Sequence, residues 1–180
     1  MSFDSQPVLR GDLVELRPLR SDDYSELYNV ASDPLIWEQH SARNRHEESV
    51  FQSFFQDSLD SCGALIATDA RTQLVIGSSR FHGYNKEKSE VEIGWTFLAR
   101  SHWGGVYNGE MKKLMLQHAF RFVKSVVFLV APENSRSQRA VERIGGVRVG
   151  LRSDGTGLDS YVYQLTTPPA SSSDNRSSNA

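Results

Sequence analysis

The stretch that decides the fold runs from residue 90 to residue 109 and reads EVEIGWTFLARSHWGGVYNG. Its first half, residues 90–98, alternates apolar and polar side chains, which is typical of a β-strand. Its second half holds the pair Gly104-Gly105 directly before a long helical pattern. Glycines at a strand-to-helix turn leave backbone N–H groups open at the positive helix end, where they can bind a diphosphate. The stretch therefore predicts a strand, a candidate phosphate-binding turn and a helix in succession.

Strict alternation assigns the side chains of this strand to two faces. One face receives Val91, Ile93, Trp95 and Phe97, and the other receives Glu90, Glu92, Gly94 and Thr96. An acidic side chain in the middle of an apolar strand is costly unless it has a partner or faces a cleft. Glu92 is thus either a solvated or salt-bridged strand residue or a carboxylate with a chemical task.

Outward from this stretch, strand and helix patterns continue to alternate. Strands are expected over residues 13–19, 64–68, 74–81, 90–98, 126–130, 147–151 and 160–165, and helices over 21–33, 46–59, 105–123 and 135–144. The order is β-α-α-β-β-β-α-β-α-β-β. It predicts an α/β fold with a mixed sheet, in which the long helix is part of a right-handed crossover.

Length and composition fit one domain of ordinary soluble character. The chain has 180 residues, 38% of them hydrophobic, and a net charge of −2. This balance argues against non-specific binding of nucleic acid or of a membrane surface. With a single cysteine and no apolar run near the length of a membrane span, we expect a cytoplasmic protein. We expect the domain to occupy residues 10–166, followed by a disordered Ser-rich tail over 167–180.

Two separated motifs resemble one known family. Trp103-Gly104-x-x-Tyr107-x-x-Glu110 and, further on, Asn134-x-x-Ser137 followed by Ile144-Gly145-Gly146 are similar to the coenzyme-binding core of GNAT-superfamily N-acetyltransferases. The second motif, with the first strand, is closest to the RimJ/RimL-like branch. The resemblance implies the GNAT acyl-CoA fold, acetyl-CoA as co-substrate, and transfer of an acetyl group to a primary amine.

The resemblance also implies residues that hold the coenzyme. The backbone of Phe97 and Leu98 would bind the pantetheine arm, and Asn134 would contact it through its amide. The pyrophosphate would lie on the N–H groups of Gly104, Gly105, Val106, Tyr107, Asn108 and Gly109. Arg100, Arg136 or Arg139 would neutralise phosphates or else be solvated surface residues. Val106 stands where the branch usually has a second glycine, and a side chain there would narrow the space for the diphosphate.

For the chemistry, the resemblance implies Glu92 as the general base. An aliphatic amine has a pKa of about 10.4 and must lose a proton before it attacks. Ser137 would lie near the sulfur and replace the tyrosine that the family often uses as the acid, with Tyr161 or Tyr163 as alternatives. The departing thiol has a pKa of about 8.5, so a strong acid is not essential.

The acceptor would lie under the link between the first two helices, residues 36–46. Trp37, His40, Arg43 and Arg45 give this link an aromatic and cationic character that suits an acidic or polar acceptor. Alternatively, the link is an exposed loop that packs Trp37 on the core. The acceptor is expected to be a small-molecule amine or a peptide N-terminus, and the protein a monomer or homodimer. The five histidines have no metal-ligand spacing, so no metal is expected, and His118 is expected in the core.

Two other functions compete with this one. A catalytically weak acyl-CoA-binding regulatory module of the same fold would share the coenzyme motif, and Val106 and the missing tyrosine favour it slightly. A plain nucleotide-binding domain is disfavoured, because the sequence has no Gly-x-x-x-x-Gly-Lys-[Ser/Thr] motif.

Overall fold

The fold was analysed in a computed structural model, which describes residues 2–153 and 158–168. Most of the predicted tail, residues 169–180, lies outside the described residues. The strands are β1 (Leu9–Arg10), β2 (Val14–Pro18), β3 (Ala64–Asp69), β4 (Val75–Asn85), β5 (Glu90–Leu98), β6 (Ser125–Val130), β7 (Val147–Ser153) and β8 (Asp159–Leu165). The α-helices are α1 (Tyr24–Ala31), α2 (Glu48–Asp60), α3 (Val106–Ala119) and α4 (Ser135–Arg143). Apart from the short β1, the order is the predicted one.

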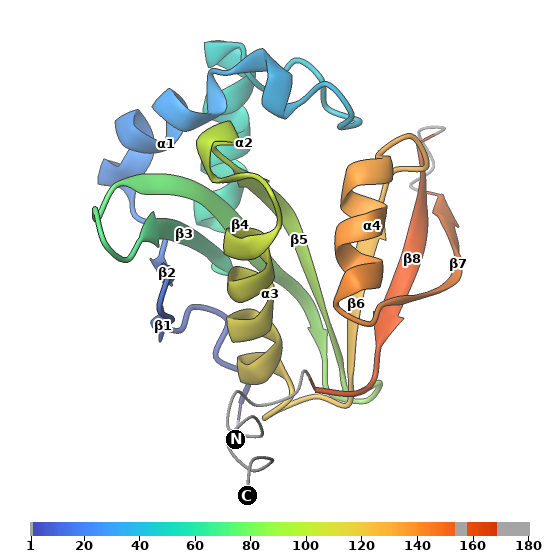
Figure 1. Ribbon diagram of the computed structural model, residues 1–180. Coiled ribbons are helices and arrows are strands. Elements are labelled where there is room, and N and C mark those ends of the chain that lie inside the picture. The colour runs from blue at the N-terminus through green and yellow to red at the C-terminus, as the bar shows by residue number, and fades with distance from the viewer. Residues whose placement is uncertain (1, 154–157, 169–180) are drawn as a thin grey trace, which may run out of the picture.

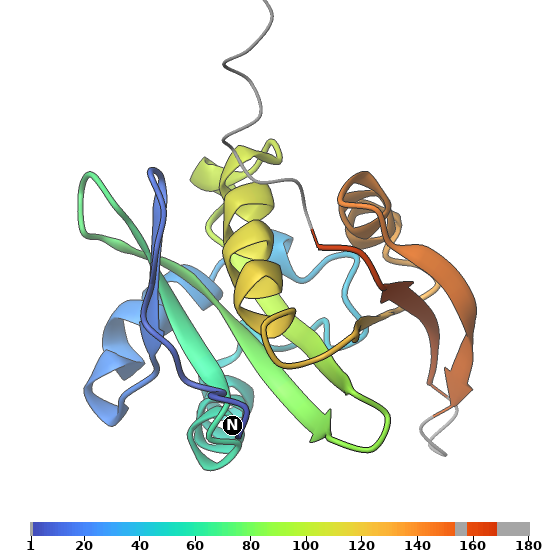
Figure 2. The same ribbon diagram turned by 90° about the horizontal axis from the view of Figure 1, so that it is seen from below.

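All eight strands form one mixed sheet in the order β1-β2-β3-β4-β5-β6-β8-β7. β5 and β6, which the crossover helix α3 connects, pair in parallel. All other neighbouring strands pair antiparallel. Helices α1 and α2 cover one face of the sheet, and α3 and α4 cover the other (Figures 1 and 2). The predicted α/β class with a mixed sheet is confirmed.

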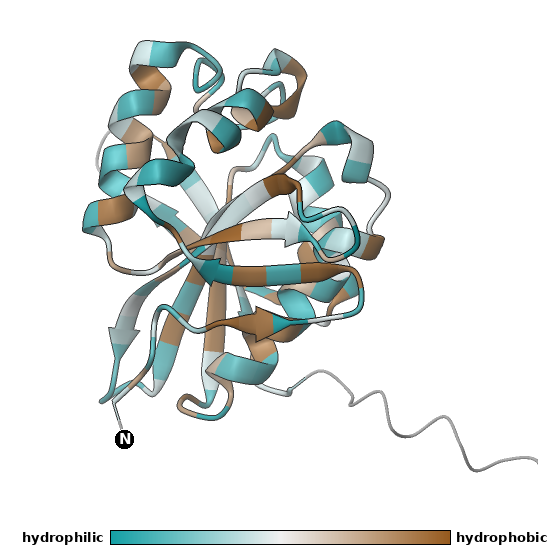
Figure 3. Cartoon of the chain, turned by 90° about the vertical axis from the view of Figure 1, so that its left-hand side faces the viewer, coloured by the Kyte–Doolittle hydropathy of each residue, from teal (hydrophilic) through white to brown (hydrophobic). Residues whose placement is uncertain are grey.

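Each face of the sheet has its own hydrophobic core. One core joins α3 and α4 to the sheet through residues such as Met111, Met115, Ile93 and Val141. The other joins α1 and α2 through Leu27, Phe51, Phe54, Phe55 and Trp37. Figure 3 shows the corresponding mixture of apolar and polar segments along the strands and helices. Because helices pack on both faces, a site is expected at the edges and strand ends of the sheet.

The predicted alternation of β5 is wrong at its C-terminal end. Gly94 pairs with Arg80 of β4, but Phe97 pairs with Ser78, so β5 contains one extra residue in a bulge. Trp95 lies in this bulge with φ +53°. The bulge reverses the faces: Ile93 belongs to the α3 core, whereas Phe97 packs with Trp37 in the α1–α2 core.

Helix α3 is also shorter than predicted, since it ends at Ala119 and not at Val123. The backbone tightens there, with the Arg121 N–H donating to His118 and the Phe122 N–H donating to Ala119. His118 lies in the core as predicted, with its Nε2 2.7 Å from the Asp4 carbonyl oxygen.

Candidate active site

The central feature of the site is the point where β5 and β6 separate. Their ladder has three pairs and ends at Glu92 opposite Val127, although β5 continues to Leu98 and β6 to Val130. β6 is paired with β8 on its other side along its whole length from Val126. Beyond Glu92 the facing edges of β5 and β6 thus have no strand partner among the residues that the structure describes (Figure 1). An extended ligand can bind such edges as an additional strand does.

Phe97 and Leu98 lie at the end of this separated region. A Cβ added to Gly77 of β4 would lie 2.0 Å from the Phe97 carbonyl oxygen, so the Phe97 backbone faces β4. Leu98, the next residue, presents its backbone to the opposite edge. Its carbonyl accepts a 3.0 Å hydrogen bond from the indole Nε1 of Trp103. Of this predicted pair, Leu98 is therefore the one whose backbone faces the separated edge.

The turn before α3 has the conformation that its glycines permit. Gly104 has φ +114° and Gly105 has φ +98°, values that favour glycine. The first intrahelical bond runs from the Gly109 N–H to the Gly105 carbonyl, and no side chain caps the helix. The N–H groups of Val106, Tyr107 and Asn108 therefore precede the helical ladder and point out of the helix end. The Val106 side chain is 66% exposed and stands in solvent.

Tyr107 and Glu110, two other residues of the same motif, connect the start of α3 to neighbouring segments. The Tyr107 hydroxyl donates to Asp69 at the end of β3 over 3.0 Å, and His102 contacts the same carboxylate at 3.2 Å. Backbone N–H groups of residues 71 and 72 also donate to Asp69, and they hold the pKa of this carboxyl far below its usual range. The Glu110 carboxylate accepts from the N–H groups of residues 12–14. These side chains fix the turn in place.

At the second motif, Asn134 is buried and begins α4. Its Oδ1 accepts a 3.1 Å hydrogen bond from the Ser137 N–H, which caps the helix. The amide nitrogen of Asn134 is the part of the side chain that the cap does not use. Ser137 is half-buried in the first turn of the same helix, which follows β6 directly.

Two of the three predicted phosphate-binding arginines have other contacts. Arg100 forms a 2.5 Å ion pair with Asp33. Arg136 donates to the Ile36 carbonyl over 3.1 Å, and its guanidinium carbon lies 4.0 Å from the Trp103 ring centroid. Both therefore connect the segment after α1 with other elements: Arg100 through the turn before α3, and Arg136 through α4. Arg139 is exposed on α4.

Arg143, which sequence reasoning missed, lies at the turn itself. Its Nη1 is 3.1 Å from the position that a Cβ on Gly105 would occupy. The sequence did contain a signal, because residues 136, 139 and 143 share one face of a helix by their spacing of three and four. A guanidinium beside an open helix end suits a phosphate ligand better than either feature alone.

Glu92 extends over the face that α1 and α2 cover. It stands opposite His82 of β4, and its Oε1 would be 3.3 Å from a Cβ on Gly94. Burial raises the pKa of Glu92 above its usual value, and the positive charges of Arg152 and Arg80 offset part of that rise. A carboxylate with a raised pKa is a stronger base once it is ionised.

Lys112 of α3 was not singled out in the sequence, yet it lies between the separating strands. Its ammonium donates to Thr96 Oγ1 on β5 and lies 5.3 Å from the ring centroid of Phe128 on β6. The residue is 5% exposed, and burial lowers its pKa to about 7. Its charge is thus placed beside the region where the β5–β6 ladder has ended.

Arg45 belongs to the link after α1, residues 36–46, and its side chain packs against aromatic rings of the core. Its guanidinium carbon lies 4.3 Å from the Phe54 ring centroid and 5.2 Å from that of Trp37. Trp37 itself is a core residue that is 1% exposed, and its Nε1 donates to the Ala31 carbonyl. His40 accepts the Ala42 N–H at Nδ1, and burial lowers its pKa to about 4. Arg43 is exposed.

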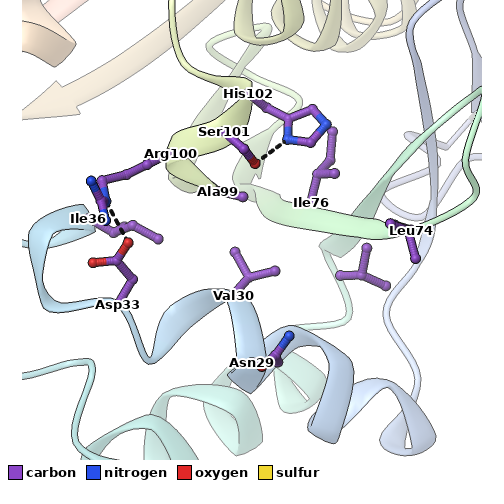
Figure 4. Close-up of a pocket in the computed structure, with 11 residues that line it drawn as sticks. Asn29, Val30, Asp33, Ile36, Leu74, Ile76, Ala99, Arg100, Ser101 and His102 are labelled. Atoms are coloured by element: carbon purple, nitrogen blue, oxygen red, sulfur yellow. Dashed lines mark hydrogen bonds and ion pairs between the residues drawn. The ribbon is translucent and has the colours of Figure 1, made fainter.

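A pocket of about 570 Å³ lies between α1, the start of β4 and residues 99–102, which precede the turn before α3 (Figure 4). The Arg100–Asp33 ion pair and His102 line it together with apolar side chains of α1 and β4. Neither Glu92 nor Asn134 is among its lining residues. The pocket is therefore separate from the edge where β5 and β6 part.

Two separating strands beside an open helix end can hold a long phosphate-bearing cofactor. The sequence matches the family described as acetyltransferase (GNAT) domain over residues 14–147, and the chain belongs to that family. It is accordingly an acetyltransferase that uses acetyl-CoA. No match to the sequence was found among curated proteins.

Solved structures with the same fold support this assignment. The GNAT-family acetyltransferase from Bacillus anthracis has 19% identity and a TM-score of 0.74, over 89% of this chain and 98% of that one. The acetyltransferase from Agrobacterium tumefaciens has 24% identity and a TM-score of 0.70, over 89% and 95%. Mycobacterium smegmatis RimJ, solved in complex with CoA-disulfide, has 20% identity and a TM-score of 0.67, over 89% and 86%. At these identities, the likeness concerns the fold.

Two further properties concern the described part of the chain. None of the helices in residues 2–153 and 158–168 is long and apolar enough to cross a membrane. Within the same ranges, no group of three or more His, Cys, Asp or Glu side chains is arranged to hold a metal ion.

Replacing Arg143 with glutamine is expected to raise the dissociation constant of acetyl-CoA about tenfold, because one charge-assisted contact is lost. Titration calorimetry measures this, with Lys124→Gln as the control for loss of an exposed positive charge. If the diphosphate binds at the turn of Gly104 and Gly105, beside Arg143, dephospho-CoA should suffer the same loss as CoA. If Arg143→Gln weakens CoA but not dephospho-CoA, the residue instead binds the 3′-phosphate.

Proposed function

We propose that this protein transfers an acetyl group from acetyl-CoA to a primary amine, on a small molecule or a protein N-terminus, by direct attack. The observation that carries the proposal is the end of the β5–β6 ladder at Glu92. On one side of this point, the open end of α3 can bind phosphate. On the other side, the half-buried carboxylate of Glu92 can bind an amine. A thioester between the strands would then connect the two. The RimJ/RimL-like motifs favour the same function.

The coenzyme is proposed to lie with its diphosphate on the N–H groups of residues 104–109, beside Arg143. The pantetheine arm would run along the separated edge of β5, where the Leu98 backbone faces it, and the amide of Asn134 would contact it from α4. Arg100 and Arg136 are proposed to support this arrangement indirectly, because their contacts hold the link after α1. Val106 is proposed to contribute its N–H. Its side chain is exposed to solvent.

Glu92 is proposed as the general base. The amine transfers a proton to the Glu92 carboxylate, directly or through a water, and its nitrogen forms a bond with the thioester carbonyl carbon. Negative charge develops on the carbonyl oxygen, and the backbone N–H of Thr96 at the β5 bulge would stabilise it, since the Phe97 backbone faces β4. The carbon–sulfur bond then breaks, and the thiolate leaves.

Ser137 is proposed to donate a hydrogen bond to the departing sulfur, from the first turn of α4. Tyr163 is a weaker alternative, because its hydroxyl already donates to Glu142 over 3.0 Å. Tyr161 packs under the guanidinium of Arg148, with 4.5 Å from the guanidinium carbon to the ring centroid. A thiol is acidic enough that solvent can complete the proton transfer.

Incubation with acetyl-CoA and a mixed panel of primary amines tests the proposal. The expected result is release of the CoA thiol that depends on the amine, together with one acetyl group gained by at least one panel member, detected by mass spectrometry. Binding of acetyl-CoA without thiol release, over the whole panel, would instead identify a regulatory acyl-CoA-binding module.

A further inference from the structure

Besides Arg152 of β7, whose charge also acts on Glu92, two arginines lie on the Glu92 side of the sheet. Arg80 of β4 stands directly opposite Gly94, the residue over which the Glu92 carboxylate extends. Its guanidinium carbon is 4.5 Å from the Trp95 ring centroid and 5.9 Å from that of Phe54. Arg45 approaches the same Phe54 ring to 4.3 Å from the link after α1. One phenylalanine ring thus lies close to two guanidinium groups.

These two positive charges lack a direct counter-ion among the residues that the structure describes. Neither Arg45 nor Arg80 belongs to an ion pair there. Arg80 is 6% exposed, and its Nη2 donates to the Ser58 hydroxyl over 2.6 Å. Its Nε is buried without any hydrogen-bond acceptor in the described part of the chain.

An unpaired buried charge is costly, and two like charges near each other increase the cost. Burial and the neighbouring Arg80 lower the pKa of Arg45 to about 10, which reflects this cost. The carboxylates of Asp57 and Glu92 attract Arg80 only at longer range. A ligand that supplies a negative charge between the two guanidinium groups would remove the penalty.

The space for such a ligand lies over Gly94. Apart from the adjoining residues Ile93 and Trp95, a Cβ at this position would have only the Glu92 carboxylate within 4 Å. The Trp95 ring, which packs against His82 and Arg80, borders this space. Glu92 itself is half-buried and His82, opposite it, is exposed, so this part of the face is open to solvent. An amine bound to Glu92 of β5 would therefore lie near Arg80 on the adjacent strand β4.

We infer that the acceptor is a primary amine that carries a carboxylate close to the amine, and that Arg80 and Arg45 bind this carboxylate. This inference rests on the proposed function and specifies its acceptor. The guanidinium groups would donate charge-assisted hydrogen bonds to the carboxylate, with the Arg80 Nε among the donors. They would hold the acceptor while Glu92 takes the proton from its amine. The carboxylate can come from an acidic side chain at a peptide N-terminus or from a free amino acid.

Matched acceptors test the inference by their kcat/KM values. One pair is a tripeptide that begins with aspartate and its counterpart that begins with asparagine. The other pair is free L-glutamine and L-glutamine amide. At least one acidic member should exceed its neutral counterpart about tenfold or more, the effect of one charge-assisted hydrogen bond. The peptide pair reports a side-chain carboxylate, and the amino-acid pair reports a free α-carboxylate.

Variants assign the preference to the two arginines. Arg45→Met and Arg80→Met should each bring the ratio of acidic to neutral acceptor close to one. Arg71→Met, which removes an exposed arginine, should leave the ratio unchanged. The ratio does not depend on how much of a variant is folded, so a partly misfolded Arg80→Met sample still gives an answer. Equal kcat/KM values within both pairs for the unaltered protein would overturn the inference and leave the proposed function intact.

Binding of the acetylated products separates this inference from the reaction. Titration calorimetry compares N-acetyl-L-aspartate with N-acetyl-L-asparagine, and N-acetyl-L-glutamine with its amide. Stronger binding of an acidic product that is lost in Arg45→Met supports the anion site even if no transfer is observed. In that case the proposed function fails, and with it the acceptor assignment, while the carboxylate-binding site of Arg80 and Arg45 stands. If no product binds and no amine is acetylated, both are wrong.

Discussion

Lys112→Met is expected to stabilise the protein by on the order of 3 kcal/mol at pH 7. The ammonium of Lys112 is buried, and desolvation lowers its pKa to about 7 from an ordinary value of 10.5. Methionine has a similar length and no charge, so it can occupy the same space between β5 and β6 without this penalty. For a chain of this size, the melting temperature should rise by roughly 6–12 °C.

The pH dependence makes this prediction specific to the charge. Between pH 7 and about 10, Lys112 is neutral in the folded protein but protonated in the unfolded chain. The unfolded state therefore binds more protons, and the contribution of Lys112 to stability improves as the pH rises. The gain from Lys112→Met should be full near pH 7 and should vanish near pH 10.

Thermal unfolding at several pH values measures this, with Lys124→Met as the control for an exposed lysine. A loss of stability in Lys112→Met, or a gain that is the same at pH 7 and pH 10, would show that the buried charge is not the cause. Lys112 lowers the stability of the fold and lies beside the proposed thioester position. The activity of Lys112→Met should therefore be measured as well.

Glu92→Gln is expected to lower kcat for acetyl transfer roughly 10²-fold at neutral pH, the low end for removal of a general base. Glutamine keeps the shape of the side chain but cannot accept the amine proton. The effect should appear in kcat more than in the dissociation constant of acetyl-CoA, because Glu92 is not among the residues proposed to bind the coenzyme.

The pH–rate profile provides a second test of Glu92. Burial raises the pKa of this carboxyl, so kcat should fall as the pH decreases through a value above its ordinary 4.5. The Glu92→Gln variant should lack this acid limb. Glu90→Gln is the matched control, since Glu90 lies on the same strand and interacts with the Ser125 hydroxyl at 3.2 Å. An unchanged kcat in Glu92→Gln across pH 6–9 would remove Glu92 from the mechanism.

Much of the fold could be predicted from the sequence, because it depends on local patterns. The uninterrupted run 126–130 indicated a buried strand, and Gly104-Gly105 indicated a turn before α3. The faces of β5 could not be predicted beyond Gly94. A bulge depends on how β4 pairs with β5, and nothing near Trp95 in the sequence shows that its φ is positive.

The site divides in the same way. Glu92 and Asn134 could be found from a strand pattern and a family motif. Arg80 and Lys112 could not, because only their contacts with residues of other elements distinguish them. Arg80 lies beside Trp95 and Phe54, and Lys112 lies between Thr96 and Phe128. Arg100 shows the opposite case. Its place before the glycine turn suggested a phosphate ligand, but the fold brings Asp33 to it.

Amide hydrogen exchange with and without acetyl-CoA tests the central claim, the position of the coenzyme, most directly. With the coenzyme at about 100 times its dissociation constant, exchange of the N–H groups of Val106, Tyr107, Asn108 and Leu98 should slow by roughly tenfold or more. Amides of β7, the edge strand that β8 separates from β6, should exchange at unchanged rates. Unaltered exchange at these four residues under saturating acetyl-CoA, or protection confined to another surface, would contradict the placement between β5 and β6.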